Sequence, residues 1–100
     1  MASCTDYEGS YTVTQTSCII TGCTIPPGSR IEVVCSPTMQ FLLDSTPHAA
    51  SVNSVGQIEV PTLDLVASVT GSVAQRYLFG VTQPAAQDSG GTEVWGADEG

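Results

Sequence analysis

The sequence predicts an all-β fold, a small β-sandwich or partly open barrel, and three observations support this prediction. Apolar and polar residues alternate with a period of two in several short segments, which is the pattern of strands with one buried face. Turn residues such as Pro26-Pro27-Gly28 separate these segments. No window shows a helical repeat with capping residues at its ends. Short strands at turn-punctuated spacing are typical of a small sandwich or barrel.

Three main strands are predicted in the first half of the chain. Residues 10–16 alternate aromatic or aliphatic side chains with threonines, which gives one apolar face. Residues 18–20 are predicted to continue or re-form this strand. Residues 30–35 follow the turn at 26–28 and alternate charged with aliphatic side chains, and residues 39–43 form the most apolar run of this half. We therefore expect these segments to supply much of the core.

The second half begins with a predicted loop over residues 44–56, which are rich in Ser and Ala. Residues 57–60 form a short strand that a proline ends. Residues 63–69 and 73–81, joined by Thr70-Gly71-Ser72, are the strongest hairpin candidate in the chain. The alternation along all these strands predicts eight core side chains: Val13, Ile31, Val33, Phe41, Leu43, Leu65, Tyr77 and Phe79.

The C-terminal end differs in composition from the rest of the chain. Residues 84–100 hold four of the ten carboxylates and no arginine, so we predict a β domain over residues 1–83 and an extended acidic tail over residues 84–100. Val94 and Trp95 are the candidate partner-binding residues of this tail, because a short strand can add to a neighbour's sheet edge and place the indole in a pocket. Removal of the tail should then leave the monomer folded. The alternative is that Trp95 folds back onto its own sheet.

The charge balance excludes several functions. The chain has no lysine and only two arginines, Arg30 and Arg76, against ten carboxylates, which gives a formal net charge of −8. Nucleic-acid binding depends on cations that neutralise phosphates, so we expect no nucleic-acid partner. An anionic membrane repels the chain for the same reason, and no apolar run approaches the roughly 18 residues that span a bilayer. Chemistry that requires a lysine nucleophile or base is impossible.

Four cysteines, Cys4, Cys18, Cys23 and Cys35, lie in the first third of the chain and allow three disulfide pairings. In one of them, Cys18 and Cys23 close a short loop while Cys4 and Cys35 tie the N-terminus to a later strand. Free cysteines that act as small core residues are the second interpretation. Zinc is the third, but only Cys18 and Cys23 approach the spacing of a zinc knuckle, so no metal is expected.

No catalytic motif stands out, and the isolated candidates have simpler interpretations. His48 could act as a general base, but no nucleophile motif surrounds it, so we interpret it as a histidine of a surface loop. Asp44, Glu59 and Asp64 could converge on a hard cation, but they lack the dense alternation of a calcium loop and are interpreted as solvated carboxylates. The sequence therefore predicts no enzyme, no catalytic residue and no cofactor.

In composition and layout, the chain resembles the small decoration or cement proteins that attach to the capsids of tailed phages. Those proteins are of about this length, are β-rich, lack signal peptides and often reach adjacent capsomers through extended termini. The resemblance implies a non-enzymatic virion protein that docks onto protein subunits of a capsid or other assembly, a homo-oligomer included. The alternative class is a secreted, disulfide-stapled binding or inhibitor module.

The compartment follows from the same features. The first residues have neither the cationic nor the apolar part of a signal peptide, so we expect synthesis in a host cytoplasm. Cytoplasmic thiols stay reduced, but a virion protein can oxidise after release. A cleaved leader would instead favour the secreted module.

Overall fold

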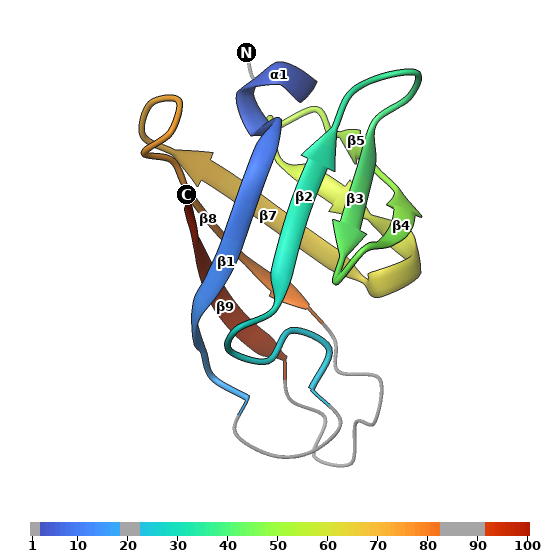
Figure 1. Cartoon of the computed structure of the whole chain (residues 1–100). Coiled ribbons are helices and arrows are strands. Elements are labelled where there is room, and N and C mark those ends of the chain that lie inside the picture. Colours follow the sequence, from blue (N-terminus) through green and yellow to red (C-terminus); the bar gives the residue numbers. More distant parts are fainter. Residues whose placement is uncertain (1–2, 19–22, 83–91) are drawn as a thin grey trace.

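The computed structural model describes residues 3–18, 23–82 and 92–100, which fold as a nearly closed antiparallel β-barrel (Figure 1). The all-β prediction is confirmed, in its barrel form. These residues form one short α-helix, one 3₁₀ helix and nine strands. The helices are α1 (Cys4–Tyr7) and η1 (Pro61–Leu63), and the strands are β1 (Gly9–Thr16), β2 (Arg30–Val34), β3 (Gln40–Leu43), β4 (Thr46–Ala49), β5 (Ser51–Val52), β6 (Ile58–Val60), β7 (Leu65–Thr70), β8 (Tyr77–Thr82) and β9 (Glu93–Glu99).

The barrel closes through one bent segment of the chain. Hydrogen-bonded strands follow the order β4-β3-β2-β1-β9-β8-β7-β6-β5, so β4 and β5 stand at the two ends of the sheet. Only Ala50 separates them in sequence, and the segment pairs with β3 through its first half and with β6 through its second. A hydrogen bond of 2.9 Å between His48 Nδ1 and Thr62 Oγ1 joins β4 to η1. The described sheet therefore leaves little unpaired edge to which another strand could add.

The prediction of a loop over residues 44–56 is wrong, because this region contains the strands β4 and β5. Asp44 and Ser45 have φ values of 49° and 75° and reverse the chain between β3 and β4, as a two-residue hairpin turn with a left-handed backbone does. Pro47 cannot donate to a ladder, but β4 is an end strand of the sheet and pairs only with β3. The turn and the end position thus allow a strand whose composition indicates a loop.

The hairpin predicted in the second half is confirmed, with β7 and β8 as its arms, but the inward face of β8 is not the predicted one. Leu78 is fully buried, whereas Phe79 is 42% exposed and Tyr77 is half-buried. Leu78 lies opposite Val69 and Ala97, whose side chains also point into the barrel. Consecutive apolar residues leave the alternation ambiguous by one position, and pairing with the neighbouring strands decides it.

The other six predicted core residues do pack in or against the core. Leu43 is partly buried against the core, and the other predicted side chains are buried in it: Val13, Ile31, Val33, Phe41 and Leu65. The remaining buried apolar side chains are Tyr7, Tyr11, Ile25, Ile58, Val60, Ala67, Leu78, Trp95 and Ala97.

The prediction of an extended acidic tail is wrong for the part of residues 84–100 that the structure describes. Residues 93–99 form β9, which lies in the middle of the sheet between β1 and β8 (Figure 1). Acidic and glycine-rich composition favours disorder for an isolated segment. Here two neighbouring strands satisfy the backbone on both sides, which composition alone does not report. Residues 84–91 lie outside the described residues.

Cys18 forms a disulfide with Cys23, and Cys4 forms one with Cys35, each with a Cα–Cα distance of 5.9 Å. This is the pairing described above for a short loop and a tethered N-terminus. The interpretations as free core cysteines or zinc ligands are therefore wrong for this structure. The first bridge closes a short loop, and the second ties α1 to the residue that follows β2. Residues 19–20 of the strand predicted at 18–20 lie outside the described residues.

Candidate functional site

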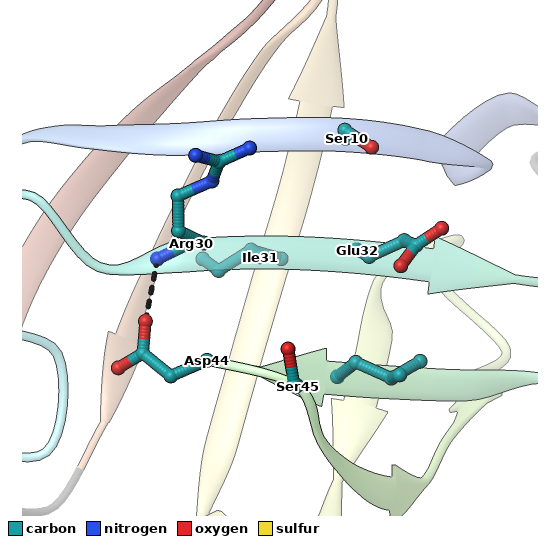
Figure 2. Close-up of a pocket in the computed structure, with 7 residues that line it drawn as sticks. Ser10, Arg30, Ile31, Glu32, Asp44 and Ser45 are labelled. Atoms are coloured by element: carbon teal, nitrogen blue, oxygen red, sulfur yellow. Dashed lines mark hydrogen bonds between the residues drawn. The ribbon is translucent and has the colours of Figure 1, made fainter.

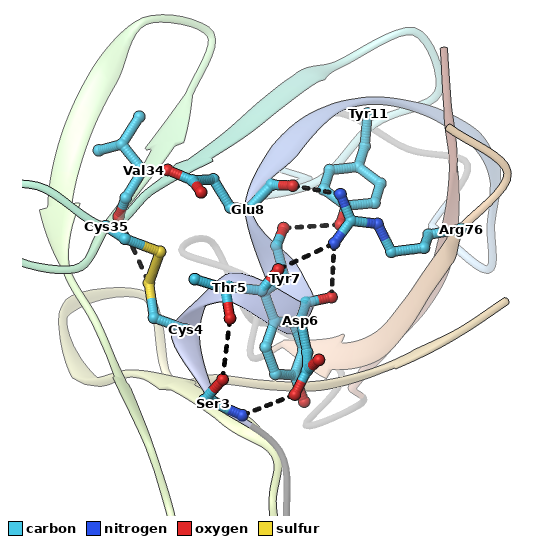
Figure 3. The surroundings of a disulfide bond; sticks show 10 residues. All are labelled: Ser3, Cys4, Thr5, Asp6, Tyr7, Glu8, Tyr11, Val34, Cys35 and Arg76. Carbon is cyan, nitrogen blue, oxygen red and sulfur yellow. Dashed lines mark hydrogen bonds between the residues drawn. A yellow bond between two sulfur atoms is a disulfide. The ribbon is translucent and has the colours of Figure 1, made fainter. Parts of the chain in front are cut away.

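One end of the barrel is covered by α1, and we call α1 with its tethers the capped end (Figure 3). The helix starts where the Ser3 N–H donates to the Asp6 carboxylate at 2.8 Å. The Tyr7 hydroxyl donates to the Gly56 carbonyl at 2.6 Å, and the Tyr11 hydroxyl donates to the Tyr7 carbonyl at 2.6 Å. Together with the Cys4–Cys35 disulfide, these bonds hold a four-residue helix that could not be stable alone.

Arg76 is the centre of the capped end. Its Nε and Nη2 donate to the two carboxylate oxygens of Glu99 at 2.9 and 2.8 Å, and the two side chains are only 7% and 9% exposed. The same guanidinium donates to the carbonyls of Asp6 at 2.8 Å and Thr5 at 3.2 Å, and to that of Glu8. All five N–H donors of the guanidinium are thus used. Arg76 therefore closes the helix end and has no donor left for a ligand.

The pKa values at the capped end agree with a structural role. The hydrogen bond from Arg76 lowers the pKa of Glu99, and the same bond raises the pKa of Arg76, so both stay charged. Burial raises the pKa of Tyr7, and it raises that of Tyr11 to about 12. Neither tyrosine is thus tuned for proton transfer near neutral pH.

Arg30, the other cation, lies in a shallow polar groove on the outer surface of β1, β2 and β3 (Figure 2). Its backbone N–H donates to the Asp44 carboxylate at 2.9 Å, and its side chain extends toward β1. Glu32 and Ser10 line the same groove. Charges of both signs face solvent here, so the groove offers only screened contacts.

The predicted histidine and carboxylate candidates do not form one site. His48 lies on β4 and contacts Thr62, so its assignment to a loop was wrong. Asp44 lines the Arg30 groove, and Glu59 and Asp64 together line a separate depression beside β6 and β7. The structure thus places two of the three carboxylates around one depression and Asp44 in another.

A sulfur and carboxylate cluster occurs where β9 begins. The sulfur atoms of Cys18 and Cys23 and a carboxylate oxygen of Glu93 lie within 4.8 Å of one another. The sulfurs are bonded to each other, so they are not the thiolates that a metal requires. Glu93 is buried, and its oxygens accept the N–H groups of Thr24 at 2.6 Å and Ile25 at 2.8 Å. Its carboxylate therefore anchors the chain after the short disulfide loop.

The two predicted partner-binding residues lie on opposite sides of β9. Trp95 is 2% exposed inside the barrel, where its Nε1 donates to Thr82 Oγ1 at 2.7 Å. This is the intramolecular alternative, and it leaves no indole for a neighbour's pocket. Val94 is 56% exposed on the outer surface. Successive side chains of a strand point to opposite faces, so the pair could not act together.

An apolar surface surrounds Val94, and we call it the outer face: Val66, Tyr77, Phe79, Val81 and Val94. Val66, Val81 and Val94 form one cross-strand row over β7, β8 and β9. Phe79, Val81 and Val94 are 42%, 43% and 56% exposed. The Tyr77 and Phe79 rings stack with centroids 5.9 Å apart. Adjacent exposed apolar side chains on one sheet face are typical of interaction sites, whereas single ones are ordinary.

A glycine shapes this face. Gly96 lies opposite Phe79, and a Cβ added to it would overlap the Tyr77 hydroxyl, so the Tyr77 ring covers the glycine. Two shallow depressions meet at Phe79 and Val94, one toward Val66 and one toward Gln15 on β1. Sequence reasoning missed this surface because it assigned Tyr77 and Phe79 to the core. The run of consecutive apolar residues in β8 was the available signal, since half of them must point outward.

Comparisons of the chain with protein families, curated proteins and solved structures found no match. Within the described residues, no helix has the length and apolar character needed to cross a membrane. The fold and the site thus define a small disulfide-linked β-barrel with a polar capped end and an apolar outer face.

Proposed function

We propose that the protein is a non-enzymatic assembly protein that docks onto a neighbouring protein through the outer face. A tailed-phage capsid is the best candidate for that neighbour, with the chain as its decoration or cement protein. The observation that carries this proposal is the cross-strand row of half-buried Val66 and exposed Val81 and Val94, with exposed Phe79 beside it. Apolar side chains gathered on a rigid sheet gain free energy when a partner covers them.

The closed sheet favours contact through side chains over strand addition. The two end strands, β4 and β5, are short, so the described barrel has little free edge to extend a neighbour's sheet. Burying one Val or Phe side chain contributes roughly 1.5–3 kcal/mol, whereas association costs about 4–15 kcal/mol. A face this small therefore binds weakly by itself.

The capped end and the disulfides support the proposal, because a virion protein must stay folded outside a cell. Two disulfides and a buried ion pair fix the barrel without help from the partner. Synthesis in a host cytoplasm with oxidation after release accommodates both disulfides. The charge of −8 keeps nucleic acids and anionic membranes from competing for the protein.

The two disulfides also favour a second candidate, a secreted binding or inhibitor module. Small secreted domains commonly use disulfides to stabilise a limited core. The two candidates share the outer face but differ in the partner and in copy number.

Mass measurement of the protein from its natural source tests the proposal. We expect the oxidised chain to co-purify with a particle at a fixed, symmetric copy number. Val94→Ser should reduce incorporation at least tenfold, whereas Val73→Ser should not. Val73 is a matched control because it is 76% exposed and lies outside the outer face. A free monomer in the medium, or equal incorporation of both variants, would overturn the capsid proposal.

A further inference from the structure

We infer that the segment seated on the outer face is an extended stretch of a partner protein, with apolar side chains at alternate positions and an Arg or Lys at one end. This inference rests on the proposed function and specifies the partner of the same face. The structural basis is a pair of carboxylates that continues the apolar row.

The row of valines runs directly into an acidic depression. Glu59 on β6 lies opposite Val66, so the cross-strand order on the outer surface is Glu59, Val66, Val81 and Val94. Asp64 follows η1 and lines the same depression as Glu59 and Val66. An apolar strip with carboxylates at one end complements a partner with apolar groups and a cation in the same order.

The two carboxylates have unused capacity. Glu59 accepts one hydrogen bond, from Asn53 Nδ2 at 3.2 Å, although a carboxylate offers about four acceptor positions. The Asp64 side chain is exposed, and the described residues supply it with no hydrogen bond or ion pair. Arg76 is bound to Glu99 and Arg30 lies over β1, β2 and β3, so neither arginine neutralises this end of the row.

Charge selects the partner over a second copy of the chain. Two copies would each carry a net charge of −8 and would each bring Glu59 and Asp64 to the interface, with no lysine to offset them. Like charges brought together oppose association and slow the encounter. A partner segment that carries a cation is instead attracted to the acidic chain.

The spacing sets the form of the segment. Strands lie about 4.8 Å apart, so the row from Val94 to Glu59 spans roughly 14 Å. Four residues of extended chain cover about 13–14 Å, with side chains on one face at every second residue. Two apolar side chains and a cation at positions one, three and five therefore match the row.

Two synthetic peptides test the inference on the isotope-labelled, oxidised full chain. The first is acetyl-Leu-Thr-Leu-Thr-Arg-amide, and the second carries Glu in place of Arg. We expect amide shifts in nuclear magnetic resonance titrations to map onto Glu59, Val66, Val81 and Val94. The Arg peptide should bind about two- to fivefold more tightly at low salt, because exposed ion pairs contribute about 0.2–1 kcal/mol each. High salt should remove this difference.

Paired variants separate the two hypotheses. Glu59→Gln with Asp64→Asn should bring the ratio of the two affinities close to one, whereas Glu32→Gln in the Arg30 groove should not change it. Equal binding of both peptides at the outer face of the unmodified protein would overturn the cation inference and leave the proposed face intact. The same holds if the shifts from the Arg peptide map elsewhere. No shift at the outer face with either peptide, together with unimpaired particle incorporation of Val94→Ser, would overturn the proposed function as well.

Discussion

The capped end and the outer face of this barrel distribute polar and apolar groups in opposite ways. At the capped end, charged groups are buried and fully paired, with Arg76 bonded to Glu99 and to three carbonyls. On the outer face, apolar side chains such as Phe79 and Val94 are partly exposed to solvent. Both regions depart from the usual arrangement of buried apolar and exposed polar groups. Only at the capped end do partners within the chain compensate for this, through hydrogen bonds and an ion pair. The contrast teaches that the first region serves the fold, and it is the basis of our proposal that the second region binds a partner.

Strand β9 connects the two regions, so its removal should have the largest effect. β9 carries Val94 on the outer face, Trp95 in the core and Glu99 at the capped end. We expect deletion of residues 92–100 to abolish cooperative unfolding, as measured by circular dichroism in urea. Deletion of Gly100 alone should leave the transition intact. A truncated chain that still unfolds cooperatively would show that β9 is dispensable.

Arg76→Ala should break the capped end. It leaves the Glu99 carboxylate buried without its cation and removes the donors to three carbonyls. Breaking a buried pair in this way costs about 3–5 kcal/mol of unfolding free energy. Arg30→Ala is the matched control, and its surface position predicts a change within about 0.5 kcal/mol. Similar losses for both variants would contradict the comparison.

The two disulfides should contribute unequally. Cys4 and Cys35 are 31 residues apart, whereas Cys18 and Cys23 are 5 apart. The loop-entropy relation gives about 4 kcal/mol for the long loop and about 2 kcal/mol for the short one. Urea unfolding of the Cys4→Ser/Cys35→Ser and Cys18→Ser/Cys23→Ser variants measures this. A larger loss from the short loop would mean that the capped end is not the principal tether.

The pH dependence of stability should also come from the capped end. The pKa of Glu99 is lowered by folding, so its contribution is present above its ordinary pKa and is lost as the pH falls through the folded value. The pKa of Tyr11 is raised from 10.0 to about 12, so its contribution is present below pH 10 and is lost as the pH rises toward 12. Unfolding midpoints across pH measure both limbs. Glu99→Gln should reduce the loss of stability at acid pH, and Tyr11→Phe should reduce the loss at alkaline pH. An unchanged pH dependence in either variant would show that the substituted residue is not its source.

Substitutions on the outer face should have the smallest effect on stability. Val94→Thr and Val81→Thr keep a β-branched side chain on an exposed strand position. We expect each to change the unfolding free energy by less than about 0.5 kcal/mol, as for Val73→Thr. A loss above about 1.5 kcal/mol, measured in urea, would mean that this face stabilises the fold itself.

The sequence by itself determined the fold class and the clear alternations. Arg30 and Glu32 alternate with Ile31 and Val33, so only one face of β2 could be buried, and the structure buries that face. The turn at Pro26-Pro27-Gly28 was also readable, and Gly28 takes the positive φ of 87° that glycine permits. These features depend on neighbours within a few residues.

The tertiary structure decided what depends on distant partners. The orientation of Phe79 follows from pairing with β7 and β9, and the central place of β9 follows from backbone bonds to β1 and β8. Arg76 could be recognised as the tether of α1 only once Thr5, Asp6 and Glu8 lay beside it. Of the candidate site, sequence reasoning found Val94 but not its neighbours. The physical reason is that composition reports local preference, whereas register, burial and ion pairing are set between segments far apart in the chain.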